Sequence, residues 1–146
     1  MKKLFKWIFP SKEMISYRKM HRRHRKELVN HAKDTVEFGW GYLHESIILQ
    51  VRHMHEYYTS GNNVWQSDET RLPIVEQLQH ILDLDAEIEA MQHDTHGVEY
   101  IHEKGVCKAI VPDDYKERVE KWCKKEQELY EEIYITIGKH LREWWD

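Results

Sequence analysis

The chain has 146 residues, of which 40% are hydrophobic and 33% are charged, with three prolines and six glycines. This length is enough for one domain with a buried core, and the composition excludes a low-complexity or disulfide-framework protein. Half of the twenty-two lysines and arginines, but only two of the twenty-six acids, lie in the first 33 residues, so the net charge is +9 there and −13 in the rest. We therefore expect a basic N-terminal arm or helix over residues 1–33 and a helical bundle domain over residues 34–146.

The N-terminal sequence MKKLFKWIFP begins like a signal peptide. Its apolar run ends at Ser11-Lys12-Glu13, before a full hydrophobic region or a small-residue cleavage site. No stretch approaches the ~20 apolar residues of a transmembrane segment. The sequence therefore predicts a soluble protein, and its two cysteines, Cys107 and Cys123, fit a reduced cytoplasmic setting in which both are inert.

Residues 11–33 carry a dense basic patch with a thin apolar stripe. One interpretation is a solvated helix that docks on the acidic domain. Another is a segment that binds nucleic acid or an anionic membrane, and a third is a disordered arm. The residues of the patch are Arg18, Arg22, Arg23, Arg25 and Lys26.

The first long helix is predicted from Asp34-Thr35, a plausible N-cap, to about Thr59, followed by Ser60-Gly61-Asn62-Asn63 as its end. Apolar residues recur along it at spacings of three and four, which is typical of one buried helix face. The predicted buried residues are Val36, Trp40, Leu43, Ile47, Val51, Met54 and Tyr58.

The second long helix is predicted from the N-cap Ser67 to about His93, with Gly97 closing the next turn. Its predicted buried residues are Ile74, Leu78, Ile81, Ile88 and Met91, with Leu84 beside them.

Residues 95–111 are the least regular part, and we expect an extended connection there, because a lone strand at Val106–Val111 would lack a partner.

The third long helix is predicted from Pro112 to the end of the chain. Its predicted buried residues are Tyr115, Val119, Trp122, Leu129, Ile133, Ile137, Leu141 and Trp144. The fold class predicted is all-α, a bundle of three long helices with an additional basic N-terminal helix or arm. Such apolar seams also favour a homo-oligomer.

Three polar residues interrupt these apolar stripes: Asp85, Glu126 and His140. A buried charge is costly unless it is paired, so the three side chains are predicted to belong to a buried polar network. The network could fix the helix register, line a ligand or active site, or hold a metal.

Two patterns suggest metal-dependent hydrolysis, and both are expected by chance in so acidic and histidine-rich a chain. His93-Asp94 resembles the doublet of helical metal-dependent phosphohydrolases. Glu117, Glu120, Glu143 and Asp146 resemble the carboxylates that hold Mg²⁺ in all-α nucleoside triphosphate pyrophosphohydrolases, but one continuous helix would separate the two pairs by ~35 Å. We therefore predict no catalytic residue, metal or cofactor, and keep a Mg²⁺-dependent nucleotide hydrolase as an alternative.

Three segments, Phe38–Met54, Leu78–Glu87 and Leu141–Asp146, resemble a family of small all-helical accessory proteins of tailed bacteriophages. The resemblance implies an accessory protein in the cytoplasm of an infected bacterium, where such proteins bind nucleotide-like signals or inhibit host proteins. We therefore expect a non-catalytic protein that sequesters a small anionic ligand or inhibits a host protein, with a nucleic-acid-binding accessory protein as a further alternative. Aromatic, Arg and His side chains suit an anionic nucleotide. The predicted ligand-binding residues are Trp40, His44, Arg52, His55, Tyr58, Trp144 and Trp145.

Overall fold

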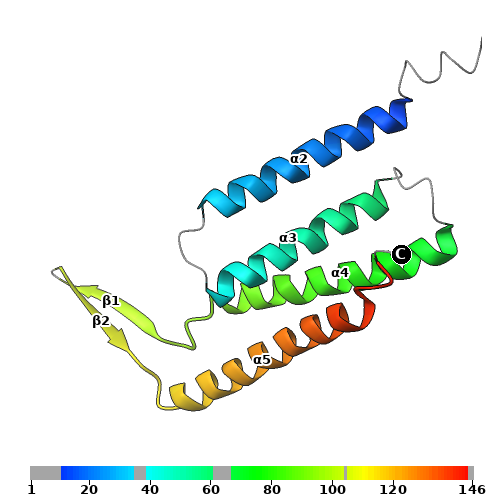
Figure 1. Ribbon diagram of the computed structural model, residues 1–146. Coiled ribbons are helices and arrows are strands. Elements are labelled where there is room, and N and C mark those ends of the chain that lie inside the picture. Colours follow the sequence, from blue (N-terminus) through cyan, green and yellow to red (C-terminus); the bar gives the residue numbers. More distant parts are fainter. Residues whose placement is uncertain (1–10, 35–38, 61–66, 104, 145–146) are drawn as a thin grey trace, which may run out of the picture. The chain divides into compact units, whose positions relative to one another are not determined.

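The computed structural model describes residues 11–34, 39–60, 67–103 and 105–144, which are drawn as coloured ribbon in Figure 1. Along these residues the elements are α2 (Lys12–Asp34), α3 (Trp40–Thr59), α4 (Asp68–Met91), β1 (Glu99–Glu103), β2 (Val106–Ile110) and α5 (Tyr115–His140). The chain divides into two compact units, Met1–Leu82 and Asp83–Asp146, and the boundary falls inside α4. The predicted helical class is therefore confirmed in its broad form, whereas the bundle of three helices with an arm stays a prediction.

In the first unit, the basic segment forms the regular helix α2, which runs antiparallel to α3. The ring of Tyr17 meets that of Tyr57 at 6.1 Å, while His31, nearer the other end of α2, stacks on Tyr42 at 5.1 Å. The start of α4 is tied to the end of α3, because Arg71 Nη1 donates a hydrogen bond of 2.9 Å to the carbonyl of Tyr58. No helix in the described ranges is long and apolar enough to cross a membrane.

The predicted start of the first long helix was wrong. Asp34 is the last residue of α2 rather than an N-cap, and α3 begins at Trp40 after the cap position Gly39. Thr35 lies outside the described residues. The capping preference of Asp is a local signal, and here the preceding helix α2 continues through Asp34.

The buried face of α3 also differs from the predicted apolar stripe. Val51 and Tyr58 are buried as expected, but Trp40 and Leu43 are 57% and 51% exposed. The other buried residues of α3 are His44, Ile48 and His53. Packing against α2 brings part of the polar side of α3 inside, which a count of apolar residues cannot reveal.

The predicted apolar stripe of α4 is confirmed except at Met91, which is half-buried. Its buried residues are Ile74, Leu78, Ile81, Leu84, Asp85 and Ile88, of which Leu78 and Ile81 are fully enclosed. The helix begins directly after the predicted cap Ser67, whose carbonyl accepts a hydrogen bond of 3.0 Å from the backbone N–H of Arg71. Pro73 lies in the second turn of α4, where its missing N–H removes one helical hydrogen bond, the one to the carbonyl of Glu69.

The connection after α4 contains a β-hairpin, so the predicted extended connection was wrong. Strand β1 pairs antiparallel with β2 from Glu99↔Ile110 to Glu103↔Val106. Gly105 supplies the positive φ of 79° that a tight hairpin turn requires. From the sequence we expect no strand at Val106–Val111, because it would lack a partner. The partner is β1, whose polar sequence EYIHE also forms a strand.

Helix α5 packs against the end of α4 within the second unit. Trp122 Nε1 donates a hydrogen bond of 2.9 Å to the carbonyl of Met91, and Lys125 forms an ion pair with Glu87. Leu129 and Ile133 are buried as predicted. The helix ends at His140 rather than at the chain end, and turns follow through Trp144, so Leu141 is exposed while Trp144 is buried.

Candidate functional site

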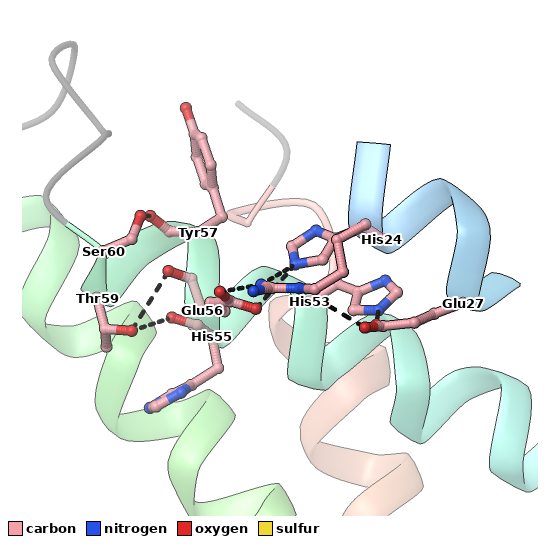
Figure 2. Close-up of polar contacts among 9 residues, drawn as sticks. His24, Glu27, His53, His55, Glu56, Tyr57, Thr59 and Ser60 are labelled. Carbon is pink, nitrogen blue, oxygen red and sulfur yellow. Dashed lines mark hydrogen bonds and ion pairs between the residues drawn. The ribbon is translucent and has the colours of Figure 1, made fainter. Parts of the chain in front are cut away.

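Two buried histidines meet face to face between α2 and α3. The rings of His24 and His53 stack with centroids 3.9 Å apart and an angle of 5° between their planes. The two residues are only 8% and 7% exposed. Figure 2 shows the two rings between α2 and α3, with the carboxylates of Glu27 and Glu56 around them.

Each histidine binds the glutamate that belongs to the other helix. His24 Nε2 lies 2.9 Å from Glu56 Oε2, and His53 Nε2 lies 2.7 Å from Glu27 Oε2. An ionised carboxylate only accepts hydrogen bonds, so both imidazoles carry a proton on Nε2. Arg23 contacts both glutamates: its Nε lies 3.6 Å from Glu27, and it forms an ion pair with Glu56. We call these five residues the histidine–glutamate cluster.

The charges of the cluster are set by burial and by the hydrogen bonds. Burial lowers the pKa of His53, because an enclosed imidazolium loses water, and the hydrogen bond to Glu27 offsets part of this effect. The pKa of Glu56 is lowered by the hydrogen bond from His24 and then by that from Arg23. The cluster therefore favours an ionised Glu56 and a neutral His53, and its hydrogen bonds hold α2 on α3.

The cluster does not have the geometry of a metal site. Within the described residues, no group of three or more His, Cys, Asp or Glu side chains is placed to bind a metal ion. The reason is visible in Figure 2, where the stacked rings send their Nε2 atoms to separate carboxylates rather than to a shared point.

Aromatic and histidine side chains extend the cluster along α2. The ring of Tyr17 makes an edge contact with His21 at 4.3 Å. Toward the other end of α2, His31 Nε2 lies 3.0 Å from the hydroxyl of Ser46 in addition to stacking on Tyr42. One side of α2 thus contacts α3 from Tyr17 to His31.

The opposite side of α2 carries the basic residues into solvent. Arg18, Arg22 and Arg25 follow each other at spacings of four and three, so they share one helix face, and Lys26 lies next to them. All four side chains are exposed, and none forms an ion pair within the described part of the chain. Arg23, which the sequence assigns to the same patch, instead faces Glu56. We call the exposed face of Arg18, Lys19, Arg22, Arg25, Lys26 and Lys33 the basic face.

The predicted ligand-binding residues of α3 do not gather in one place. Trp40 and Tyr58 are 18 residues apart on one helix, which is about 27 Å at 1.5 Å per residue. His44 and Tyr58 are buried, and Arg52 is exposed. His55 points away from the histidine–glutamate cluster (Figure 2). Trp144 is buried in the second unit, and Trp145 lies outside the described residues.

Two of the three predicted network residues lie near one tyrosine. The pKa of Tyr130 is raised by burial and then by the negative charges of Glu126 and Asp85. Asp85 is buried and Glu126 is half-buried. His140 has a local partner, because its Nδ1 lies 2.9 Å from Glu143 Oε2, one turn further along the chain.

The four carboxylates of the hydrolase alternative are engaged with local cations or lie outside the described residues. Glu117 and Glu120 form ion pairs of 2.7 and 3.7 Å with Lys121 and Lys116 on the same exposed side of α5. Glu143 binds His140 beyond the other end of that helix, and Asp146 lies outside the described residues. The His93-Asp94 doublet serves a turn, because Asp94 Oδ1 accepts a hydrogen bond of 2.8 Å from the backbone N–H of His96.

Comparison with known proteins gives no match, whether to family models, to curated proteins or to solved structures. Membership of a family of phage accessory proteins therefore stays a prediction.

The histidine–glutamate cluster was missed from the sequence, although a pattern marks it. His24 and Glu27, and likewise His53 and Glu56, are three residues apart, so each helix presents the same His-x-x-Glu pair. The pattern is not specific, because His140-x-x-Glu143 has it too and closes on itself within one turn. Only the antiparallel packing of α2 and α3 makes the two pairs exchange partners.

Proposed function

We propose that this protein is a non-catalytic nucleic-acid-binding protein that holds the phosphate backbone on the basic face of α2, with little dependence on base sequence. The observation that carries the proposal is the division of α2 into two sides. Its inner side is fixed to α3 by the histidine–glutamate cluster, and its outer side is a row of exposed cations.

The row has the length and charge to follow a phosphate backbone. From Arg18 to Lys33 it extends about 22 Å at 1.5 Å per residue. Duplex DNA carries one negative charge per ~1.7 Å of its axis, so several phosphates lie within reach of such a row. Glu27 is the one acid in this stretch of sequence, and its carboxylate is bound to His53, so it does not neutralise the basic face.

The residue types on the basic face suit phosphate contacts and lack the amides that read adenine. Between Arg18 and Lys26 the exposed face offers Arg and Lys side chains and no Asn or Gln, the amides that read adenine. Phosphate contacts by Arg and Lys position a protein without reading sequence. The displaced counterions then make the affinity fall steeply with salt.

The test compares two charge-matched variants by fluorescence anisotropy with a short DNA duplex. Replacing Arg18, Arg22 and Arg25 with Gln removes three cations of the basic face. Replacing Lys116, Lys121 and Lys124 with Gln removes three cations from α5, where each is paired with a glutamate. With about five phosphate contacts, the wild-type affinity falls about 500-fold between about 50 and 200 mM salt.

The arginine variant is expected to lose about 2–3 from the slope of log K against log salt, since each lost contact removes about 0.9. The lysine variant keeps the wild-type slope. Equal weakening by both variants, or binding that is insensitive to salt, contradicts the proposal. Binding of the wild-type protein to anionic lipid vesicles but not to DNA assigns the basic face to membranes instead.

Sequestration of a small anionic ligand, or inhibition of a host protein, stays a prediction from the sequence. The residues expected to serve it on α3 are spread along that helix, from Trp40 at its start to Tyr58 near its end.

A further inference from the structure

The β-hairpin leaves its strands uncovered in the described part of the chain. All ten residues of β1 and β2 are exposed. Four of them are large apolar side chains, 40–61% exposed: Tyr100, Ile101, Val106 and Ile110. A two-stranded sheet is at best marginally stable in water and is normally completed by a third strand or by packing. Such an edge also offers unpaired N–H and C=O groups to another strand.

We propose that β2 pairs with β2 of a second copy of this chain, in an antiparallel four-stranded sheet with a two-fold axis at Ala109. The pairing adds strand to strand, so the backbone supplies the hydrogen bonds and the side chains set the register. A two-fold contact is closed, and it stops at a dimer.

Charge selects β2 rather than β1 as the shared edge. The sequence of β1 has Glu99 and Glu103 at its ends, so pairing two β1 strands around Ile101 would set each Glu99 opposite Glu103 of the partner subunit. Like charges directly opposite each other are destabilising. Strand β2 is apolar except for Lys108, and a lysine at an edge can direct its ammonium group to solvent.

Charge also selects the register. An axis at Lys108 would place the two lysines opposite each other, whereas an axis at Ala109 places Lys108 opposite Ile110 of the partner subunit. Within each hairpin, Ile110 pairs with Glu99. Lys108 and Glu99 of the partner subunit then lie on one face, two strand spacings or about 10 Å apart at Cα, within reach of a lysine and a glutamate side chain that lean together.

The other face of the sheet also fits this register. Tyr100 pairs with Ala109 in each hairpin. The axis therefore brings two small Ala109 side chains together between two Tyr100 rings, and the rings can cover the shared edge. Aromatic side chains are among those that contribute to packing between neighbouring strands.

The test is disulfide formation between copies in the absence of nucleic acid, with Cys107→Ser and Cys123→Ser as the background. Ala109→Cys places two thiols on directly opposite residues, with Cα atoms about 5 Å apart, which a disulfide can bridge. Lys108→Cys is the matched control, since its two copies lie about 8 Å apart in this register, beyond the range of a disulfide. We expect rapid cross-linking of the first variant alone.

Sedimentation of the wild-type protein is expected to show a dimer, and Ala109→Pro, which removes an edge N–H, is expected to shift it to monomer. Equal or faster cross-linking through Lys108→Cys overturns the register. A wild-type monomer at high micromolar concentration overturns the dimer and leaves the hairpin to another partner. Both outcomes are independent of nucleic-acid binding, because none is present.

Discussion

At the scale of single residues, the same side-chain pattern has different outcomes in different surroundings. His24 and His53 each form a hydrogen bond with the glutamate of the neighbouring helix, not with the glutamate three residues further along their own helix. His140 binds Glu143 one turn away. Enclosure decides between these cases, because a buried imidazole must find a partner within the packed interface, whereas an exposed one can use whichever carboxylate is near.

Backbone conformation gives a matched pair of glycine substitutions. Gly97 has a φ of 82°, and a Cβ added there would lie 2.7 Å from Arg118 Nη1, whereas a Cβ added at Gly138 in α5 would meet nothing within 4 Å. Gly97→Ala is expected to destabilise the protein by about 1–2 kcal/mol because an L side chain is disfavoured at positive φ. Gly138→Ala is expected to stabilise it by about 0.5–1 kcal/mol.

Urea unfolding followed by circular dichroism measures both changes. A Gly97→Ala variant as stable as the wild type would show that this turn can change conformation at no cost.

At the scale of elements, α2 is best understood as a helix with two unlike sides. Tyr17, Met20, His24 and His31 face α3, while the basic face points to solvent. The side of α2 that faces α3 has few apolar residues, so hydrogen bonds and stacked rings contribute much of the contact between the two helices. An attachment of this kind depends on protonation far more than an aliphatic seam does.

The stability of the first unit is expected to fall as the pH falls. The folded-state pKa of His53 lies below its unfolded value of about 6.5, so the unfolded chain binds the proton more readily, and stability present above about pH 6.5 is lost below it. The lowered pKa of Glu56 adds a loss that begins below about pH 4.5. The groups around His53 are His24, Glu27, Arg23 and Glu56.

Urea midpoints at about pH 7.5 and about pH 5.5 test this expectation. His53→Gln should reduce the difference between the two midpoints, while His93→Gln, at an exposed position after α4, should leave it unchanged. A wild-type midpoint that is constant over this interval would exclude a role for His53 in the acid response.

At the scale of the whole molecule, α4 provides a continuous buried stripe that begins in the first unit and ends in the second. Leu78 is fully buried on this stripe, while Leu72 on the same helix is 49% exposed. Charge is distributed differently: the basic excess lies in the first 33 residues and the acidic excess in the remainder. The stripe of α4 therefore contributes to stability, and the charge distribution is the basis of the proposed nucleic-acid binding.

Leu78→Ala is expected to lower the free energy of unfolding by about 2–5 kcal/mol, because it removes buried methyl groups and leaves a cavity. Leu72→Ala makes the same chemical change at an exposed position and should cost less than about 1 kcal/mol. Thermal unfolding by calorimetry compares the two. Similar losses from both variants would contradict the assigned buried face of α4.

The success of the sequence predictions followed the strength of the local signal. Helix α4 was predicted well because Ile74, Leu78, Ile81 and Ile88 repeat with a helical period on one side only. Helix α3 was predicted less well. Its buried face includes the polar residues His44 and His53 as well as apolar ones, and the predicted core residue Trp40 is exposed. The hairpin was missed because two five-residue strands give too short a pattern to separate from an extended connection.

The sequence by itself determined the helical class, the approximate helix positions and the basic excess near the N-terminus, because helical period and net charge are properties of the chain read in order. Only the tertiary structure decided that His24 and His53 stack, that each takes the other helix's glutamate, and that Arg23 leaves the basic face while Arg18, Arg22 and Arg25 stay on it. These outcomes depend on the packing of residues about thirty positions apart, and no local pattern fixes which sides of two antiparallel helices meet.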